Sequence, residues 1–220
     1  MYYDYLGSDT YKVTVILFRN CNSAAQFDAQ IDYTIFNGDN SLFTVYQTAT
    51  ANRVITVLPV DYSNPCVIPP PGLCVDRAVY IDTITLTPSP LGYYMSYQRC
   101  CWATNILNIV NPGDFGLTLT CVIPSTTALP VGYNNAARFV NLPPLVLCSQ
   151  NELDFDHSAI DPDGDSVRIF LCEVDQYALS SGSGANPNPE QPGPYLPTVW
   201  EVGYSAPLPF GAPSPMLLDS

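Results

Sequence analysis

The sequence predicts an all-β fold, arranged as two antiparallel β-sandwich domains that are braced by disulfide bonds. Three observations support this prediction. Apolar residues alternate with polar ones in short runs, which is the period of a β-strand. The 22 prolines and 13 glycines separate these runs as turns do. An apolar stripe at helical spacing persists nowhere for three turns, and residues 102–110 are the one helical candidate.

The first strands follow from this alternation. In the run 11–18, Tyr11, Val13 and Val15 share one face, and apolar residues on both faces late in the run are typical of a central strand. Residues 31–35 repeat the pattern and end in an Asn-Gly-Asp-Asn turn. Further strands are predicted at residues 43–47, 54–60, 78–86, 92–101 and 116–123.

A change of composition near residues 130–135 predicts a domain boundary, with a first domain at 1–134 and a second at 135–220. We expect the second domain to be incomplete, because the sequence stops after an extended segment. The Pro- and Gly-rich stretch 180–194 is predicted to be a long exposed loop. Strands of the second domain are predicted at residues 138–142, 145–148, 152–158, 167–174 and 198–204.

The chain is strongly acidic, with 7 Lys and Arg against 20 Asp and Glu and a net charge of −13. Phosphate backbones would repel such a chain, so we expect no nucleic-acid partner. Without a run of about twenty apolar residues, no membrane insertion is expected either. The N-terminus lacks the basic and apolar regions of a signal peptide, which favours a processed chain or part of a longer one.

Cysteine usage predicts disulfides rather than a metal site. The eight cysteines form no C-x-x-C motif, and with one histidine a zinc site is not favoured. Disulfides imply an oxidising compartment, so we expect an extracellular or cell-surface location. The eight candidates are Cys21, Cys66, Cys74, Cys100, Cys101, Cys121, Cys148 and Cys172.

Two disulfide pairings are favoured by proximity in the sequence. Cys66 and Cys74 enclose a stiff proline-rich loop, which predicts a local disulfide between them. Cys148 and Cys172 are expected to brace the second domain.

The adjacent pair Cys100 and Cys101 falls in a predicted strand, so the two side chains should point to opposite faces and find different partners. Cys21 and Cys121 would then pair with them, in an order that the sequence leaves open.

The stretch HSAIDPDGDS carries the main candidate site. Asp161, Asp163 and Asp165 lie on a tight turn that Pro162 and Gly164 favour, ahead of an apolar alternation. Hard cations such as Ca²⁺ take several oxygen ligands at once, so these carboxylates are candidate metal ligands. The alternative is a solvated turn whose aspartates bond the local backbone.

Other polar residues near this turn allow two interpretations. Asp154 and Asp156 have the spacing that places both on one strand face, and we expect Asp156 to add a ligand to the cation site. Two facing carboxylates would also suit glycoside hydrolysis. His157 is the only histidine, and a strand-end position bonded to a carbonyl is favoured over a ligand role.

Several motifs in order resemble a known group of proteins. They are Tyr5-Leu6-Gly7, Phe18-Arg19-Asn20-Cys21, Ser96-Tyr97 before Cys100-Cys101, the stretch 159–166, and Gly203-Tyr204-Ser205. Together they resemble the N-terminal β modules of large secreted surface proteins of Bacteroidota, of the gliding-adhesin type exported by type IX secretion. The aspartate turn itself resembles that of cadherin-like and immunoglobulin-like extracellular modules.

The resemblance implies a non-enzymatic structural or adhesive role, with no catalytic residues to carry over. Other copies or neighbouring domains of a surface assembly, such as a fibre, are the implied partners. Two departures from the pattern bear on this. Trp102-Ala103 stands where the family continues Arg-Asn, and the sorting domain of such exported proteins is absent.

The alternative function is a carbohydrate-binding module that recognises surface glycans. Several of the fifteen tyrosines, with Trp102 and Trp200, could form a stacking platform for sugars. Tyrosine also suits a half-buried sheet, where it pairs across strands, and this interpretation is favoured. An enzyme is not predicted, because G-x-S-x-G is missing and any histidine-dependent machinery would depend on His157 alone.

Overall fold

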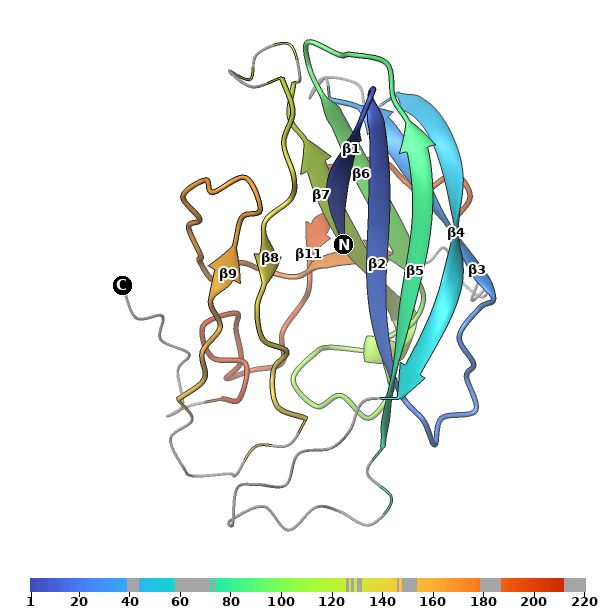
Figure 1. The fold of residues 1–220 in the computed structure, drawn as a ribbon. Helices are drawn as coiled ribbons and strands as arrows, with labels where there is room; N and C mark the ends of the chain where they lie inside the picture. Colours follow the sequence, from blue (N-terminus) through green and yellow to red (C-terminus); the bar gives the residue numbers. More distant parts are fainter. Residues whose placement is uncertain are drawn as a thin grey trace. The chain divides into compact units, whose positions relative to one another are not determined.

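The computed structural model describes residues 1–38, 44–57, 72, 74–125, 127, 129, 132–145, 147, 154–178 and 187–211. Its regular structure is β throughout, apart from one 3₁₀ turn, η1 (Pro112–Asp114), so the all-β prediction is confirmed (Figure 1). The strands are β1 (Tyr2–Gly7), β2 (Thr10–Asn20), β3 (Gln30–Asn37), β4 (Val45–Val57), β5 (Val75–Thr85), β6 (Tyr93–Arg99), β7 (Phe115–Ile123), β8 (Arg138–Phe139), β9 (Ala159–Ile160), β10 (Asp175–Ala178) and β11 (Leu196–Pro197).

The chain divides into two compact units that interleave along the sequence. Unit 1 comprises Met1–Ile31, Thr50–Thr87 and Tyr133–Val167, and unit 2 comprises Asp32–Ala49, Pro88–Gly132 and Arg168–Ser220. Neither coincides with the ranges 1–134 and 135–220, and the division into two sandwich domains at residue 134 stays a prediction. The described part of the chain contains no helix that is long and apolar enough to cross a membrane.

Unit 1 is built on the strand order β1-β2-β5-β4, with β2 and β5 side by side (Figure 1). β2 and β5 pair antiparallel without interruption from Thr10 opposite Thr85 to Asn20 opposite Val75. As the alternation predicts, Tyr11, Val13 and Val15 are all buried. Long, regular pairing with one buried face fixes the register, because a slip by one residue would turn these apolar side chains outward.

The disulfide of unit 1 extends this ladder. Cys21 follows Asn20 directly and Cys74 precedes Val75, so the register places their Cα atoms 5.5 Å apart and the two cysteines are bonded. The predicted Cys66–Cys74 bond is therefore wrong. Nearness in sequence favoured that bond, whereas strand pairing decided the partner. Cys66 itself lies outside the described residues.

Unit 2 contains the strand order β4-β3-β6-β7-β10-β11, in which β4 is represented by its residues 45–49. One face of β3 and β6 supplies the core, where Tyr33, Ile35, Met95 and Tyr97 are buried. The other face, which we call the polar face, carries Phe36 opposite Tyr94 at one end and polar side chains along the rest. Thr34 lies opposite Ser96, and both are fully buried although neither is apolar.

The remaining cysteine predictions are wrong where the structure describes them. Cys100 and Cys101 are bonded to each other. Both lie beyond Arg99, the last residue of β6, so the alternation of a strand does not separate their side chains. Cys121 and Cys172 are free thiols, which excludes the predicted Cys148–Cys172 bond and any bond from Cys121 to the adjacent pair. Cys148 lies outside the described residues.

The predicted strands hold in the first half of the sequence and mostly fail in the second. β4 joins two predicted strands into one, and β1 is a strand that the alternation did not predict. Of the predicted strand 138–142 only β8 forms, and the described parts of 145–148, 152–158, 167–174 and 198–204 are not strands, nor is 102–110 a helix. The alternating residues Val167 and Ile169 are 39% and 37% exposed, so the apolar pattern there is not matched by a buried face.

Candidate functional site

The aspartate turn in unit 1 forms as predicted. The Gly164 amide donates to the Asp161 carbonyl oxygen at 3.1 Å, which closes a four-residue turn. Gly164 has a φ of 83°, in the left-handed region that glycine tolerates. The Asp163 amide donates to Asp161 Oδ1 at 2.8 Å, so the first aspartate stabilises the turn with its own side chain.

The second aspartate of the turn clamps a distant residue of the same unit. The Asn135 backbone amide donates to Asp163 Oδ2 at 2.6 Å, and Asn135 Nδ2 donates to Oδ1 at 2.7 Å. Asn135 Oδ1 in turn accepts the Tyr5 backbone amide at 2.6 Å. One amide side chain therefore links the turn to strand β1.

Residues 133–138, which we call the seam segment, lie along β1 through further contacts. The Ala136 amide donates to the Tyr3 carbonyl oxygen at 3.0 Å, and Asn134 Nδ2 donates to the Tyr3 hydroxyl at 2.7 Å. Tyr133 stacks on Tyr5, with ring centroids 5.4 Å apart and planes 9° apart. The seam segment thus covers β1, which would otherwise present an open strand edge.

An ion cluster completes this contact. Lys12 Nζ lies 2.9 Å from Asp4 Oδ2, and Arg138 donates to Asp4 Oδ1 from the seam segment. The Arg138 guanidinium also lies 4.9 Å from the centre of the Tyr2 ring, a cation–π distance. Burial by itself would raise the pKa of Asp4, but hydrogen bonds and charges from Lys12 and Arg138 outweigh it and lower that pKa.

The four predicted metal ligands do not converge in this arrangement. Both carboxylate oxygens of Asp163 are hydrogen-bonded to Asn135, and Asp161 Oδ1 is hydrogen-bonded within the turn. Asp165 is exposed. Within the described ranges, no three His, Cys, Asp or Glu side chains are grouped as metal ligands. As it stands, the geometry is that of a hydrogen-bonded clamp, and Ca²⁺ binding, which takes six or more oxygen ligands, stays a prediction.

The fourth predicted ligand, Asp156, serves a separate turn. Asp156 Oδ1 accepts the Ser158 amide at 3.0 Å, and Oδ2 accepts Asn141 Nδ2 at 3.1 Å. The Ser158 amide is the main cause of the lowered pKa of Asp156. The neighbouring His157 ring stacks on Phe139 at a centroid distance of 4.1 Å, which gives this histidine an aromatic packing partner.

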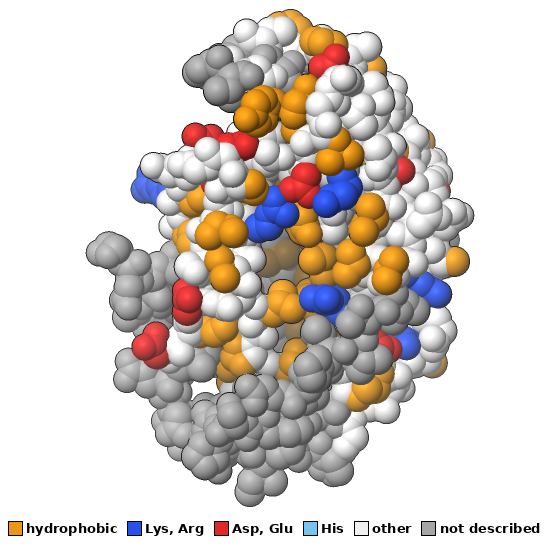
Figure 2. All heavy atoms as spheres, viewed as in Figure 1, with side chains coloured by type: hydrophobic (Ala, Val, Ile, Leu, Met, Phe, Trp, Pro, Cys, Tyr) orange, Lys and Arg blue, Asp and Glu red, His pale blue; other side chains and the backbone are white. Residues whose placement is uncertain are grey.

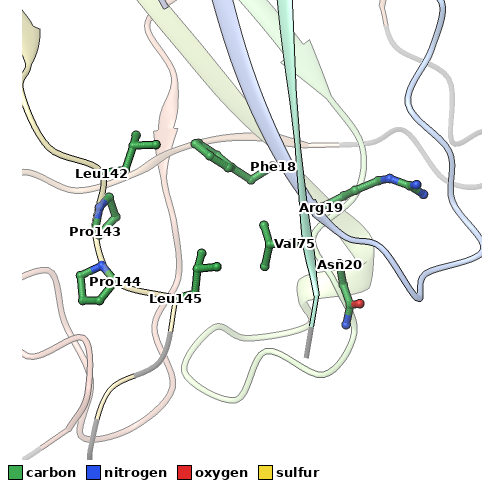
Figure 3. A pocket seen from close by; sticks show the side chains of 8 residues that line it. All are labelled: Phe18, Arg19, Asn20, Val75, Leu142, Pro143, Pro144 and Leu145. Atoms are coloured by element: carbon green, nitrogen blue, oxygen red, sulfur yellow. The ribbon is translucent and has the colours of Figure 1, made fainter. Parts of the chain in front are cut away.

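Unit 1 also carries an apolar groove that the sequence patterns did not indicate (Figure 3). It encloses about 410 Å³. Phe18 and Val75, from the end of the β2–β5 pair, face Leu142 and Leu145 across it, while Arg19 and Asn20 point away (Figure 3). Its lining residues are Phe18, Arg19, Asn20, Val75, Leu142, Pro143, Pro144 and Leu145. The Leu-Pro-Pro-Leu run at 142–145 is the sequence signal that marks it. Such a groove suits an apolar side chain.

The tyrosines divide between core and surface. Tyr3, Tyr93 and Tyr97 are buried and cannot stack on a sugar. Tyr94 and Tyr195 are half-buried and stack on each other, with centroids 6.3 Å apart. Comparisons of the chain with family models, with curated proteins and with solved structures found no match.

Proposed function

We propose that this chain is a non-enzymatic structural or adhesive module of an extracellular surface protein, folded as β-sandwich domains and working beside other copies or neighbouring domains. The observation that carries the proposal is the double fastening of unit 1. At one place Asn135 bonds both β1 and the aspartate turn, and at another the Cys21–Cys74 disulfide extends the β2–β5 ladder. Disulfides persist in oxidising compartments, which supports the extracellular location.

Fastenings of this kind suit a module that carries load. Strands β2 and β5 pair over eleven residues, so pulling them apart along their length must break many hydrogen bonds together. The disulfide prevents separation of that pair at one end. At the chain's start, the seam segment and the Asp4 ion cluster keep β1 in place. This concentration of contacts serves mechanical stability rather than a reaction.

Exposed apolar side chains support assembly with other copies. Around the short β8–β9 pair, Phe139, Val140 and Ile160 are 54%, 53% and 55% exposed. Figure 2 shows hydrophobic side chains over much of the visible face, with charged groups scattered among them. Exposed apolar patches mark interaction sites on soluble proteins, and the alternation of extended backbone places Val140 and Ile160 on one face of this pair. Because β8 and β9 are only two residues long, a strand from a second copy could extend this pair.

Self-association can be measured by sedimentation velocity from 1 to about 100 µM, a range that brackets the micromolar affinity of weak specific interfaces. The wild type should form dimers or larger ordered species as concentration rises. Val140→Lys with Ile160→Lys should remove them, whereas Val54→Lys, at an equally exposed valine on β4, should not. A wild type that stays monomeric throughout, or that associates equally well in the double variant, would contradict assembly through this surface.

Calcium binding at the aspartate turn is a separate proposal, because Asp163 would have to exchange Asn135 for the ion. Two variants distinguish the clamp from a cation site. Asp165→Asn removes one carboxylate and leaves the clamp, while Asn135→Ala removes the side-chain hydrogen bond of the clamp, keeps the backbone one and leaves every carboxylate. If Ca²⁺ binds, it should raise the melting temperature of the wild type and of Asn135→Ala but not of Asp165→Asn. Equal melting curves with Ca²⁺ and with EDTA in all three proteins would exclude the ion.

A carbohydrate-binding module is the second candidate, and one observation favours it. Trp200 is half-buried and its Nε1 donates to Glu173 Oε2 at 2.6 Å, which places a carboxylate at the edge of the indole ring. Sugars bind to such pairs by stacking and hydrogen bonding. A glycan array tests this function. Saturable binding by the wild type that is lost in Trp200→Ala and kept in Trp102→Ala would support carbohydrate binding over the structural role.

A further inference from the structure

Residues 187–195 of unit 2, which we call the strap, lie across the polar face of β3 and β6. The Gln191 amide donates to Gln98 Oε1 at 2.9 Å, and Gln98 Nε2 donates back to the Gln191 carbonyl oxygen at 3.2 Å. The Tyr195 hydroxyl donates to Ser96 Oγ at 2.9 Å. These contacts are polar, and the stacking of Tyr195 on Tyr94 adds one aromatic contact, so hydrogen bonds supply most of what holds the strap on the sheet.

Glu190 is the centre of this contact. Its backbone amide donates to Thr34 Oγ1 at 2.9 Å, and the Thr34 hydroxyl donates to Glu190 Oε2. The residue is only 2% exposed and Thr34 is fully buried. Glu190 Oε1 is buried without a hydrogen-bond partner. An ionised carboxylate in this position would be desolvated with one of its two oxygens left without a hydrogen-bond donor, which costs far more than burying the neutral acid.

Among the described residues, the charged side chain that acts on Glu190 is the acidic Asp32. Asp32 on β3 is acidic and accepts the side-chain amide of Asn188 at 2.8 Å. Asp175 on β10 is also acidic and acts on Tyr94 and Tyr195, whose pKa values burial raises, so that both stay neutral. Ionising Glu190 would therefore add a second negative charge beside Asp32, with no cation among these groups to offset it.

We propose that the strap is a proton-dependent latch, which the neutral Glu190 carboxyl holds on the sheet and which detaches when that carboxyl ionises. Detachment would expose Thr34, Ser96 and Gln98, a row of hydrogen-bonding side chains on β3 and β6. The inference does not depend on the structural or adhesive role, since it concerns only contacts within unit 2.

The direction of the pH dependence follows from where Glu190 titrates. Burial raises its pKa from 4.5 to about 7, the hydrogen bond from Thr34 opposes that rise and the charge of Asp32 adds to it. A raised folded-state pKa means that the Glu190 carboxyl of the docked strap keeps its proton to a higher pH than the same carboxyl of the free strap. Docking is therefore strongest below about pH 4.5, weakens as the pH rises toward 7, and stays weak above that.

The test is hydrogen exchange of strap amides in the full chain between pH 5 and 9, comparing the wild type with Glu190→Gln at each pH. Glutamine keeps the size and polarity of the side chain but cannot ionise, and the comparison at equal pH cancels the chemical pH dependence of exchange. Because each pKa unit is a factor of ten in the docking equilibrium, a rise from 4.5 to about 7 predicts that strap amides of the wild type exchange about 300-fold faster than those of the variant at pH 9, and within about fivefold of them at pH 5. Glu201→Gln, at an exposed glutamate, should follow the wild type.

Equal protection of the strap in the wild type and Glu190→Gln at pH 9 would overturn the latch. If Glu190→Gln does not fold, the wild type alone decides. Its strap amides, corrected for intrinsic exchange rates, must lose protection between pH 5 and 9 while the β6–β7 amides keep theirs. Constant protection of the strap across that range would also overturn the proposal.

Discussion

Asn135 holds Asp163 with two hydrogen bonds, from its backbone amide to Oδ2 at 2.6 Å and from Nδ2 to Oδ1 at 2.7 Å. The same side chain accepts the Tyr5 amide, so it joins segments that lie 130 and 28 residues away along the chain. Composition and spacing make Asp163 a candidate metal ligand. In the structure, each of its carboxylate oxygens has a protein partner instead.

Removing this aspartate should destabilise unit 1. Asp163→Ala deletes two charge-assisted hydrogen bonds, so the free energy of unfolding should fall by about 2 kcal/mol. Asp165→Ala, on the exposed end of the same turn, should change it by less than about 0.5 kcal/mol. Urea denaturation of both variants measures the difference, and equal losses would show that the clamp contributes nothing specific.

The Asp4 cluster should make unit 1 sensitive to acid. The folded-state pKa of Asp4 is lowered, so its stabilising contribution is complete above its unfolded pKa of about 3.9 and disappears as the pH falls through the lower folded value. Asp4→Asn should therefore reduce the free energy of unfolding by about 1 kcal/mol at pH 7, as for a partly buried ion pair, and by much less at pH 2. Urea denaturation at several pH values tests this. A deficit that stays constant down to pH 2 would exclude the ion cluster as its source.

The disulfide of unit 1 should stabilise through the long loop that it closes. For a separation of 53 residues, loop-closure entropy predicts that Cys21→Ser with Cys74→Ser lowers the free energy of unfolding by about 4 kcal/mol. The Cys100–Cys101 disulfide joins adjacent residues and closes no comparable loop. Replacing both cysteines with serine should therefore lower the free energy of unfolding by only about 1 kcal/mol on the same basis. Denaturant unfolding without reductant measures both, and equal losses would contradict the loop argument.

Gly116 on β7 should not tolerate a side chain. A Cβ there would lie 2.3 Å from the Arg99 carbonyl oxygen and 2.8 Å from its carbon, both of them backbone atoms that cannot turn aside. Gly116→Ala should cost about 3 kcal/mol by overpacking and forced backbone movement. At Gly113 the nearest atom is the Thr104 methyl at 3.0 Å, which can rotate away, so Gly113→Ala is the matched control. Thermal unfolding of the two variants compares them.

Alternating residues were sufficient to predict the strands whose one face is buried. Residues 11–18 and 31–35 lie in β2 and β3, with Val13 and Ile35 fully buried. Alternate side chains of a strand point to the same face, so a strand with one buried face has apolar residues at every second position. The same alternation at 167–174 did not form a strand, since a strand also needs a partner to pair with, and the pattern does not specify one. β1 was not predicted because its residues, Tyr-Tyr-Asp-Tyr-Leu-Gly, do not alternate between apolar and polar. It forms between β2 on one side and the seam segment on the other.

The sequence by itself determined the all-β class and the aspartate turn, because alternation and the Pro-Asp-Gly order act through neighbouring residues. Only the tertiary structure decided which cysteines bond and what the aspartates contact. Strand register brought Cys21 to Cys74, and folding of the seam segment onto β1 brought Asn135 to Asp163. The burial of Glu190 is also decided by the tertiary structure. Its position in a proline-rich stretch predicts exposure, and only the polar face beneath the strap buries it.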